Sequence, residues 1–371
     1  MSYTDERAAV QYALDNDGVV ELEGRPYHFS DGLVYNENGA ALKGKSPGLT
    51  ELIFHNATGD MLEVRDGVAN ALLEGAYVKG ASETSHTSGY GLRAVNTHNF
   101  QARHFRMNHT KHGVRIDGGN DQFITKLQDF VIGFCEDAIT LDNYAQDTFL
   151  ESGVVANCTG DGVVLNHCSG VYASNMDVLL CQYGVAAKPG AGKEVKAVWL
   201  NTVLADNCSS DGFKLSTEGG SLRHVELNNC WASMCGNSEY SNGIKVYPGS
   251  GTIEWVRVHG GKYLLNKGSG ILLMGGKHVS VSGVQCSDNV QFAPTSRAGI
   301  EVWPGACDFS ITGCDTGNSD GGNSQGWGVY VHAGASDNYR IEGNNCYNCF
   351  SGGVGDTGAG TNKIVTNNMS M

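Results

Sequence analysis

Proline is scarce in this chain, with 6 residues among 371. Proline has no N–H group to donate to a neighbouring strand, so its scarcity suits a chain that is strand over most of its length. Long apolar runs are also missing, and we expect no membrane insertion. The opening residues Met1 to Arg7 contain neither the basic nor the apolar part of a signal peptide, so we expect the protein to be made in a cytoplasm.

Basic residues are outnumbered: 25 lysines and arginines stand against 39 aspartates and glutamates, giving a formal net charge of −14. Such an excess repels nucleic acid and anionic membranes, so neither is an expected partner. Patterns for metal sites are lacking too, because Cys346 and Cys349 form one pair at zinc-ligand spacing without a second pair. We therefore expect no metal and no other cofactor.

What the chain does contain is a short phrase that returns eleven times: an opening residue, usually glycine, then apolar, variable and apolar residues. Successive copies begin 22 to 31 residues apart, the period of a solenoid in which each unit makes one turn. The alternation has a period of two, so the repeating element is a strand. The copies are Met61–Val64, Gly91–Ala94, Gly113–Ile116, Ala138–Leu141, Gly162–Leu165, Gly184–Ala187, Gly212–Leu215, Gly243–Val246, Gly270–Leu273, Gly299–Val302 and Gly328–Val331.

Strands one turn apart run in the same direction, so the sheets that they build are parallel. We predict an all-β chain folded as a parallel β-helix of about 12 coils. Residues 5–15 have the pattern of a helix, which would cover the open edge of the stack. We expect a cap in residues 1–45, coils in residues 46–350 and an irregular end in residues 351–371, where Asp356 replaces an inward apolar residue.

Cysteine is absent before Cys135, yet 12 cysteines follow. Most stand shortly before or within the next strand, at comparable places in successive turns. Residues at one repeat position stack one strand spacing apart, about 4.8 Å. Thiols pack well as small apolar groups, and a reducing compartment disfavours disulfides. We therefore expect a buried, reduced cysteine ladder.

The N-terminal segments carry a resemblance. Ala8–Leu14, Gly18–Leu22, Tyr27 and Ala41–Gly44 read as a helix, a hydrophobic strand after glycine, a tyrosine turn and a Leu-x-Gly. This opening resembles the pectate-lyase-like superfamily of single-stranded right-handed β-helices, and among its members the chain is most similar to bacteriophage tailspikes and related virion β-helices. The resemblance implies a right-handed β-helix and a homotrimer that binds, and often cleaves, a host surface polysaccharide.

The chain departs from two patterns of these relatives. It lacks the Trp-Ile-Asp-His and Arg-x-Pro-x-x-Arg signatures of pectate lyases, so calcium-dependent pectate cleavage is not expected. It also lacks separate head-binding and trimerisation domains, so attachment to a virion would use the N-terminal cap or other virion proteins.

The residues between and after the apolar positions of the phrase are predicted to point outward in two rows. The first row is Glu63, Arg93, Arg115, Thr140, Val164, Ala186, Lys214, Lys245, Leu272, Glu301 and Tyr330. The second row is Val95, Asp117, Asp142, Asn166, Lys188, Ser216, Tyr247, Met274, Trp303 and His332. We expect these rows to form an exposed face.

Asp117 and Asp142 would stack on the order of 5 Å apart in this face. Like charges at that distance repel, which favours protonation of one member, and a glycosidase needs such a pair. Arg115 lies beside them and is a candidate for substrate binding. The alternative is that both aspartates are ordinary turn residues at strand ends.

A second group, the aromatic patch, consists of Lys245, Tyr247, Glu301, Trp303, Tyr330 and His332. Exposed rings suit the apolar faces of sugars, and Glu301 is the candidate acid or base of this patch. The other five residues, together with Lys214 of the same row, are candidates for binding a polysaccharide. The alternative is that the rings form the subunit interface of a trimer.

Three functions stay open. The first is a virion protein that binds a host surface polysaccharide, with or without cleaving it by hydrolysis or elimination. The second is a structural or adhesive spike without activity. The third is a free polysaccharide lyase or glycoside hydrolase. Products released from host glycan separate the first from the second.

Overall fold

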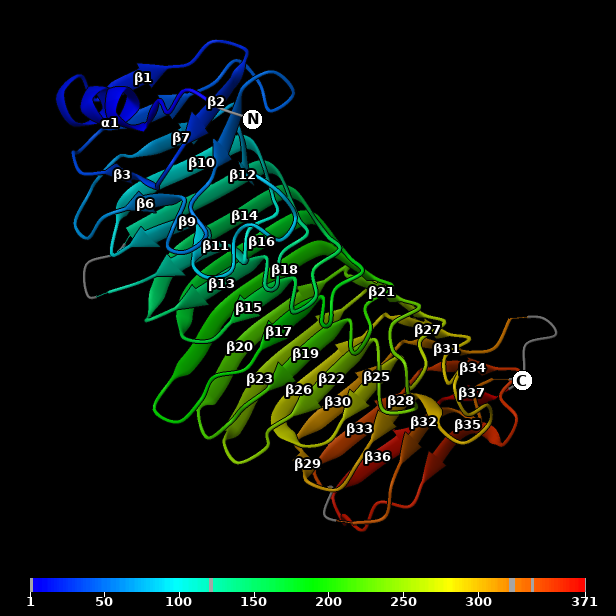
Figure 1. Cartoon of the computed structure of the whole chain (residues 1–371). Coiled ribbons are helices and arrows are strands. Elements are labelled where there is room, and N and C mark those ends of the chain that lie inside the picture. Colours follow the sequence, from blue (N-terminus) through cyan, green and yellow to red (C-terminus); the bar gives the residue numbers. More distant parts are fainter. Residues whose placement is uncertain (1–2, 120–122, 320–323, 335–336, 371) are drawn as a thin grey trace. The chain divides into compact units, whose positions relative to one another are not determined.

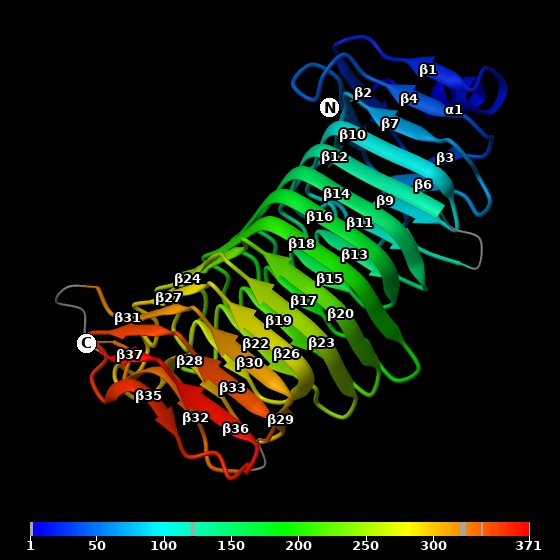
Figure 2. The same cartoon turned by 180° about the vertical axis from the view of Figure 1, so that it is seen from behind.

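The structure is a computed structural model that describes residues 3–119, 123–319, 324–334 and 337–370. The chain falls into two compact units, Met1–Asp177 and Val178–Met371. Each unit is a right-handed parallel β-helix, and the two contain about 12 turns in all (Figures 1 and 2). The predicted all-β, parallel β-helical fold is confirmed.

The repeated phrase forms one sheet in each unit, which we call the phrase sheet. In the first unit its strands are β3 (Leu33–Tyr35), β6 (Leu62–Val64), β9 (Tyr90–Val95), β11 (His112–Asp117), β13 (Ile139–Asp142) and β15 (Val163–Leu165). In the second unit they are β17 (Val185–Ala187), β19 (Phe213–Ser216), β22 (Ile244–Tyr247), β25 (Ile271–Leu273), β28 (Ala298–Val302), β32 (Trp327–Val331) and β35 (Gly352–Asp356). Neighbours within each unit pair in parallel, so the predicted repeat is confirmed.

The other wall of the first unit we call the companion sheet. In the early turns this wall consists of two ladders of short strands. In the later turns one long strand takes the place of two short ones, and the first long strand pairs with the last short strand of each ladder. The short strands are β1 (Val19–Glu21), β4 (Ala41–Lys43) and β7 (Leu72–Glu74), and β2 (Pro26–Phe29), β5 (Glu51–Phe54) and β8 (Tyr77–Gly80). The long strands are β10 (His98–Asn108), β12 (Phe123–Gly133) and β14 (Ala145–Ala156). A further strand, β16 (Cys168–Leu179), contains the boundary between the units.

The companion sheet of the second unit starts from one long strand, β18 (Glu194–Asp206), and divides into two ladders. One ladder is β20 (Ser221–Asn228), β23 (Thr252–His259), β26 (Gly276–Ser282), β29 (Ala306–Cys307), β30 (Phe309–Thr312), β33 (Tyr339–Glu342) and β36 (Lys363–Thr366). The other is β21 (Trp231–Ser233), β24 (Lys262–Leu264), β27 (Gln285–Ser287), β31 (Asp315–Gly317), β34 (Asn345–Tyr347) and β37 (Met369–Ser370).

The core of each unit lies between its two sheets, where the apolar residues of the phrase meet. Val114 pairs with Ile139 and Ile116 with Leu141 in the next turn, and all four are buried. Ile300 is also buried. Like side chains therefore stack on like side chains, and the inward positions predicted from the alternation are confirmed.

The N-terminal helix α1 (Arg7–Asn16) lies against β1 and β3 of the first unit (Figure 1). It buries Val10 and Leu14. The Gln11 side chain accepts a hydrogen bond from the Val34 N–H at 2.8 Å and donates one to the Val34 carbonyl at 2.7 Å. It therefore pairs with β3 as a neighbouring strand would. The helix thus occupies hydrogen-bonding groups at the edge of the phrase sheet.

The segment beyond residue 350 is more regular than we expected. There β35 pairs with β32, β36 with β33 and β37 with β34. Asp356 stands in a strand because its carboxylate accepts a hydrogen bond from the Tyr339 hydroxyl at 2.7 Å and pairs with Lys363 at 2.9 Å. A satisfied carboxylate replaces the inward apolar residue without ending the strand.

All 12 cysteines are present as thiols. Ten are buried, while Cys307 and Cys349 are half-buried, so the predicted burial of the ladder is confirmed for most of its members. Within the part of the chain described here, no helix has the length and apolar character needed to cross a membrane.

The stacked phenylalanines of the first unit test how strongly its turns depend on one another. Phe105 and Phe130 are buried register partners with ring centroids 5.8 Å apart. We expect Phe130→Ala to lower the free energy of unfolding by about 3–5 kcal/mol, because the cavity it leaves cannot collapse between two sheets. Phe134→Ala, at an exposed ring four residues away, should change it by less than about 1 kcal/mol. Urea unfolding measures both, and equal losses would contradict a turn-to-turn core.

Candidate functional site

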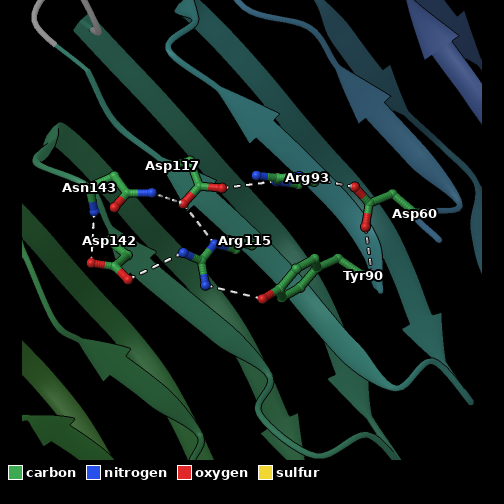
Figure 3. Close-up of polar contacts among 7 residues, drawn as sticks. All are labelled: Asp60, Tyr90, Arg93, Arg115, Asp117, Asp142 and Asn143. Carbon is green, nitrogen blue, oxygen red and sulfur yellow. Dashed lines mark hydrogen bonds and ion pairs between the residues drawn. The ribbon is translucent and has the colours of Figure 1, made fainter. Parts of the chain in front are cut away.

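Asp117 and Asp142 are direct register partners at the ends of β11 and β13 in the first unit (Figure 3). Strand pairing puts them one turn apart, as the repeat predicted. Neither is exposed as expected, however: the residues keep only 2% and 6% of their accessible surface. Neighbouring side chains cover them, so this end of the phrase sheet is a packed polar layer.

Arg115 is the side chain that holds the two carboxylates together. Its Nε donates to Oδ1 of Asp117 at 2.7 Å, and its Nη2 donates to Oδ2 of Asp142 at 3.2 Å. Figure 3 shows the guanidinium reaching both aspartates. The repulsion that we expected between the carboxylates is therefore offset by a cation that bridges them.

Further donors complete this network. Arg93 Nε donates to Oδ2 of Asp117 at 2.9 Å, and Asn143 Nδ2 donates to Oδ1 at 2.8 Å. Asn166 Nδ2 donates to Asp142 at 3.0 Å. Burial would lower the pKa of Arg93, but its hydrogen bond and charge interaction with Asp117 raise it above the ordinary value. A carboxylate held by so many internal donors is arranged for ion pairing, and the catalytic role of the two aspartates stays a prediction.

Arg115 shows the same balance. Burial would lower its pKa, but the hydrogen bond and charge of Asp117 raise it, and Tyr90 adds to the effect. Its Nη1 donates to the Tyr90 hydroxyl at 3.1 Å, with the guanidinium carbon 5.5 Å from the centre of that ring. Tyr90 was missed by sequence reasoning, although it stands at a repeated position, directly before the opening glycine of a phrase.

In the second unit, the first outward row keeps the predicted register: Lys214 pairs with Lys245, Lys245 with Leu272, Leu272 with Glu301 and Glu301 with Tyr330. The second row places Tyr247, Trp303 and His332 at or just after the ends of the same strands. Tyr247 is 44% exposed, and Trp303, Tyr330 and His332 are half-buried. The described residues of the aromatic patch are thus brought to one face of the second unit.

Glu301 differs from the expectation, because only 2% of its surface is exposed. Its Oε2 accepts hydrogen bonds from Ser269 Oγ and Arg297 Nε, each at 2.7 Å. Its Oε1 accepts from Trp303 Nε1 at 2.9 Å and from His332 Nε2 at 2.6 Å. A polymer cannot reach this carboxylate directly, which corrects the idea that Glu301 contacts substrate as the acid or base.

Glu301 is held in its ionised form. Burial would raise its pKa, but the hydrogen bonds from His332, Ser269 and Trp303 and the charge of Arg297 lower it below the ordinary value. Arg297, whose side chain is 7% exposed, also donates to the carbonyl of Glu239. The buried ion pair therefore has partners on both sides, the condition under which burial of charge is tolerated.

His332 connects this buried carboxylate to solvent. An ionised carboxylate only accepts hydrogen bonds, so the proton between the two groups belongs to His332 Nε2. When the imidazole carries a single proton, that proton lies on Nε2 and Nδ1 is an acceptor. The side chain is 37% exposed, and no hydrogen bond to Nδ1 occurs among the residues that the structure describes. The geometry yields an oriented, accessible proton acceptor.

Aromatic rings surround this histidine. The Tyr330 ring stands edge-on to it with centroids 4.7 Å apart, and the Trp303 ring does so at 5.8 Å. Trp327 packs against Tyr330 at 5.3 Å. Rings on an outer wall around a polar group form the mixed surface by which proteins bind sugars.

Two lysines extend the polar part of this face. Lys214 Nζ donates to the Tyr183 hydroxyl at 3.3 Å and lies 4.4 Å from the centre of that ring. Lys245, its register partner, interacts with the charge of the buried Asp211. Burial raises the pKa of Asp211, while Lys245, Lys214 and hydrogen bonds from Asn242 oppose that rise. Leu272 separates Lys245 from Glu301 in the ladder.

Sequence reasoning missed Ser269 and Arg297, which hold Glu301. Ser269 could have been found, because it directly precedes the opening glycine of a phrase, as Tyr90 does. Arg297 has no such signal, because it lies in an irregular loop before β28 and not at a repeated position. Within the described ranges, no group of three or more His, Cys, Asp or Glu side chains is placed to hold a metal ion.

The lowered pKa of Glu301 makes a prediction about stability. Its ionised form stabilises the fold at pH values above 4.5, the ordinary value, and this contribution disappears as the pH falls through the lower folded value. At pH 7 we expect Glu301→Gln to lower the free energy of unfolding by about 3 kcal/mol. The difference from the unaltered protein should shrink below pH 4.5. Glu342→Gln, at a partly exposed carboxylate, is the control and should cost under about 0.5 kcal/mol.

Neither a protein-family model nor a curated protein matches this sequence. Solved structures do. The A-module of a mannuronan C-5 epimerase from Azotobacter vinelandii superimposes with a TM-score of 0.66 and 16% identity, over 98% of this chain and 96% of that one. Pre-mature gene product 12 of bacteriophage phi29 superimposes with a TM-score of 0.60 and 15% identity, over 98% of this chain and 50% of that one. The enzymatically active domain of tailspike protein 2 from bacteriophage CBA120 superimposes with a TM-score of 0.51 and 13% identity, over 92% of this chain and 46% of that one.

Identities this low report the fold. They confirm the parallel β-helical fold that the repeated phrase predicted, and bacteriophage proteins are among the matches. This chain is similar in fold to a polysaccharide epimerase over nearly the whole of both chains, and to a tailspike over part of the tailspike's length.

Proposed function

We propose that this protein binds a polysaccharide on the aromatic patch of its second unit and cleaves it, with His332 as the group that transfers the proton. The observation that carries the proposal is the contact between His332 and Glu301, a half-exposed imidazole held at 2.6 Å by a buried carboxylate. Such a carboxylate fixes the ring and stabilises the imidazolium that forms when Nδ1 takes a proton. Glu301 is then a positioning residue.

A sugar polymer is the ligand class that suits the surroundings of His332. Trp303, Tyr330 and the exposed Tyr247 offer ring surfaces, and Lys214 and Lys245 offer hydrogen-bond donors along the same ladder. Successive turns lie about 4.8 Å apart along the strands' stacking direction, and these groups stand on four of five successive turns, so an extended chain can contact several at once. The fold matches support this class, since one is named for mannuronan.

Proton transfer to His332 Nδ1 serves two kinds of cleavage. In hydrolysis His332 takes a proton from the water molecule that attacks the sugar carbon, while the glycosidic C–O bond breaks and the leaving oxygen takes up a proton from solvent. In elimination His332 removes the proton on the carbon next to a sugar carboxylate, a C=C bond forms, and the glycosidic oxygen leaves and takes up a proton from solvent. In both routes a fixed orientation places the acceptor, and an anionic partner behind it stabilises its protonated form. Glu301 provides the partner, and Arg297 and Ser269 fix Glu301.

For the biological setting we propose a virion-associated, tailspike-like protein that recognises a host cell-surface polysaccharide. The fold matches to bacteriophage CBA120 tailspike protein 2 and to phi29 gene product 12 support this setting. A homotrimer, and attachment to other virion proteins through the N-terminal cap, belong to the same proposal. A free polysaccharide-modifying enzyme is the second candidate, favoured by the match that covers 96% of an epimerase module.

The catalytic part of the proposal is tested at His332. We expect His332→Gln to reduce release of reducing ends from host capsule, lipopolysaccharide or mannuronan by about 100-fold or more, because the proton acceptor is lost. His259→Gln is the matched control, since His259 lies exposed on β23 of the companion sheet and should leave turnover unchanged. Product release is measured by a reducing-sugar assay, and by absorbance of the unsaturated sugar if the reaction is an elimination.

Two outcomes of that assay redirect the proposal. Polysaccharide binding without any product would identify a non-catalytic adhesive spike. Full activity of His332→Gln, with loss of turnover in Asp117→Asn or Asp142→Asn, would move the catalytic centre to the first unit and restore the role first predicted for those carboxylates.

Binding is tested separately at Trp303. We expect Trp303→Ala to weaken polysaccharide binding about 10-fold, since one stacking ring contributes about 1–1.5 kcal/mol beyond its buried area. Affinity electrophoresis in gels that contain the glycan measures this change. Analytical ultracentrifugation on the same variant decides the alternative, because a trimer that dissociates would identify the rings as a subunit interface.

A further inference from the structure

We propose that Cys135 and Cys158 are a redox-responsive pair that closes to a disulfide when the protein leaves a reducing compartment. The two thiols follow the long strands β12 and β14 of the first unit, at equivalent places in consecutive turns. Their sulfur atoms lie 3.4 Å apart, in van der Waals contact. This inference does not depend on the proposed function, because both residues lie outside the aromatic patch.

The backbone already has the spacing that a disulfide requires. Gly133 and Ala156 are register partners, and each cysteine follows its strand by two residues. Thr159 N–H donates to the Cys135 carbonyl at 3.0 Å, so the two turns stay hydrogen-bonded beyond the cysteines. Adjacent strands lie about 4.8 Å apart, inside the range of about 4.4–6.8 Å between Cα atoms across a disulfide. Closure therefore needs side-chain rotation and a small approach of the sulfurs.

Cys135 is 5% exposed and Cys158 is 4% exposed, and Cys135 borders a surface cavity. Cys135 lines a cavity of about 350 Å³ together with Phe134, Glu136 and Asn157. The Phe134 ring is 53% exposed, so the wall beside Cys135 faces solvent. Thiol–disulfide exchange needs access of this kind, because the incoming disulfide must lie in line with the attacking sulfur.

A second stacked pair offers a comparison. Cys208 and Cys235 stand at the equivalent place in the second unit, each two residues after the end of its strand, where Asp206 and Ser233 are register partners. Hydrogen bonding to Cys235, together with burial, raises the pKa of Cys208 far above its ordinary value. The Cys235 thiol is fully buried and lies within 3.3 Å of the Ser233 carbonyl. Cys208 is 1% exposed and Cys235 is 0% exposed, less than Cys135 and Cys158, so the Cys208–Cys235 pair should react more slowly.

The reaction balances with a small disulfide such as oxidised glutathione. The Cys135 thiolate attacks one glutathione sulfur, the glutathione S–S bond breaks, and one glutathione leaves as thiolate and takes up a proton. The Cys158 sulfur then attacks the mixed disulfide, its proton passes to solvent, and the second glutathione leaves. Two protein thiols are oxidised to one disulfide, and one oxidised glutathione is reduced to two thiols. The new bond ties two turns across 23 residues.

The experiment uses the folded full-length protein, first fully reduced, then incubated with oxidised glutathione. Alkylation and mass spectrometry count the remaining thiols, and peptide mapping finds the bridge. We expect the count to fall from 12 to 10, with Cys135 joined to Cys158. Cys208→Ser should still form this bridge, whereas Cys135→Ser and Cys158→Ser should not. Circular dichroism confirms that each variant is folded.

Three results would overturn the proposal. Full alkylation of both cysteines after incubation, in folded protein, shows that the pair does not close. A stable glutathione adduct on Cys135 shows that the second sulfur cannot reach the first. Oxidation of Cys208 and Cys235 as fast as that of Cys135 and Cys158 shows that access from the surface does not select the Cys135–Cys158 pair.

Discussion

The structure depends on register: within each unit, every turn must place its residues directly over the equivalent residues of the turn before. Hydrogen bonds between parallel strands enforce this alignment, and a slip of one residue would turn every apolar side chain of the phrase outward. Alignment converts a position in the repeat into a column of side chains. Columns of Val and Ile build the core, and columns of polar residues build the outer layer.

The stacking of equivalent residues also determines which charged side chains lie next to each other. Two aspartates in one column repel at strand spacing, so the column is stable only with a cation between them. Arg115 supplies it from the neighbouring row, where it reaches Asp117 in its own turn and Asp142 in the next. Asn166 continues the column with a donor instead of a third carboxylate. The polar layer of the first unit is thus a set of alternating charges, whose geometry follows from register.

Much of this arrangement could be predicted from the sequence, because the fold repeats. The alternation in Gly299–Val302 placed Ile300 and Val302 inside, and the spacing of the phrases aligned Lys214 with Lys245 and Glu301 with Tyr330. Periodicity could not reveal how side chains turn once they leave the strand. Glu301 points outward in the pattern yet is buried, because Arg297 and Trp303 of its own turn and His332 of the next turn fold over it. Arg297 comes from an irregular loop, where the repeat carries no information.

A solenoid wall has no deep interior cleft, so a catalytic group on it needs a dry environment made from side chains. The aromatic patch provides one. Rings from successive turns cover Glu301, and in that setting its attraction to Arg297 and its hydrogen bond to His332 are less weakened by water than they would be on an open surface. The cost of burying the carboxylate is offset by four donors, which leave it ionised. Of its four donors, His332 and Trp303 reach solvent, and His332 is the one of these two that can exchange a proton. This is why the chemistry proposed here resides on the histidine and not on the carboxylate that orients it.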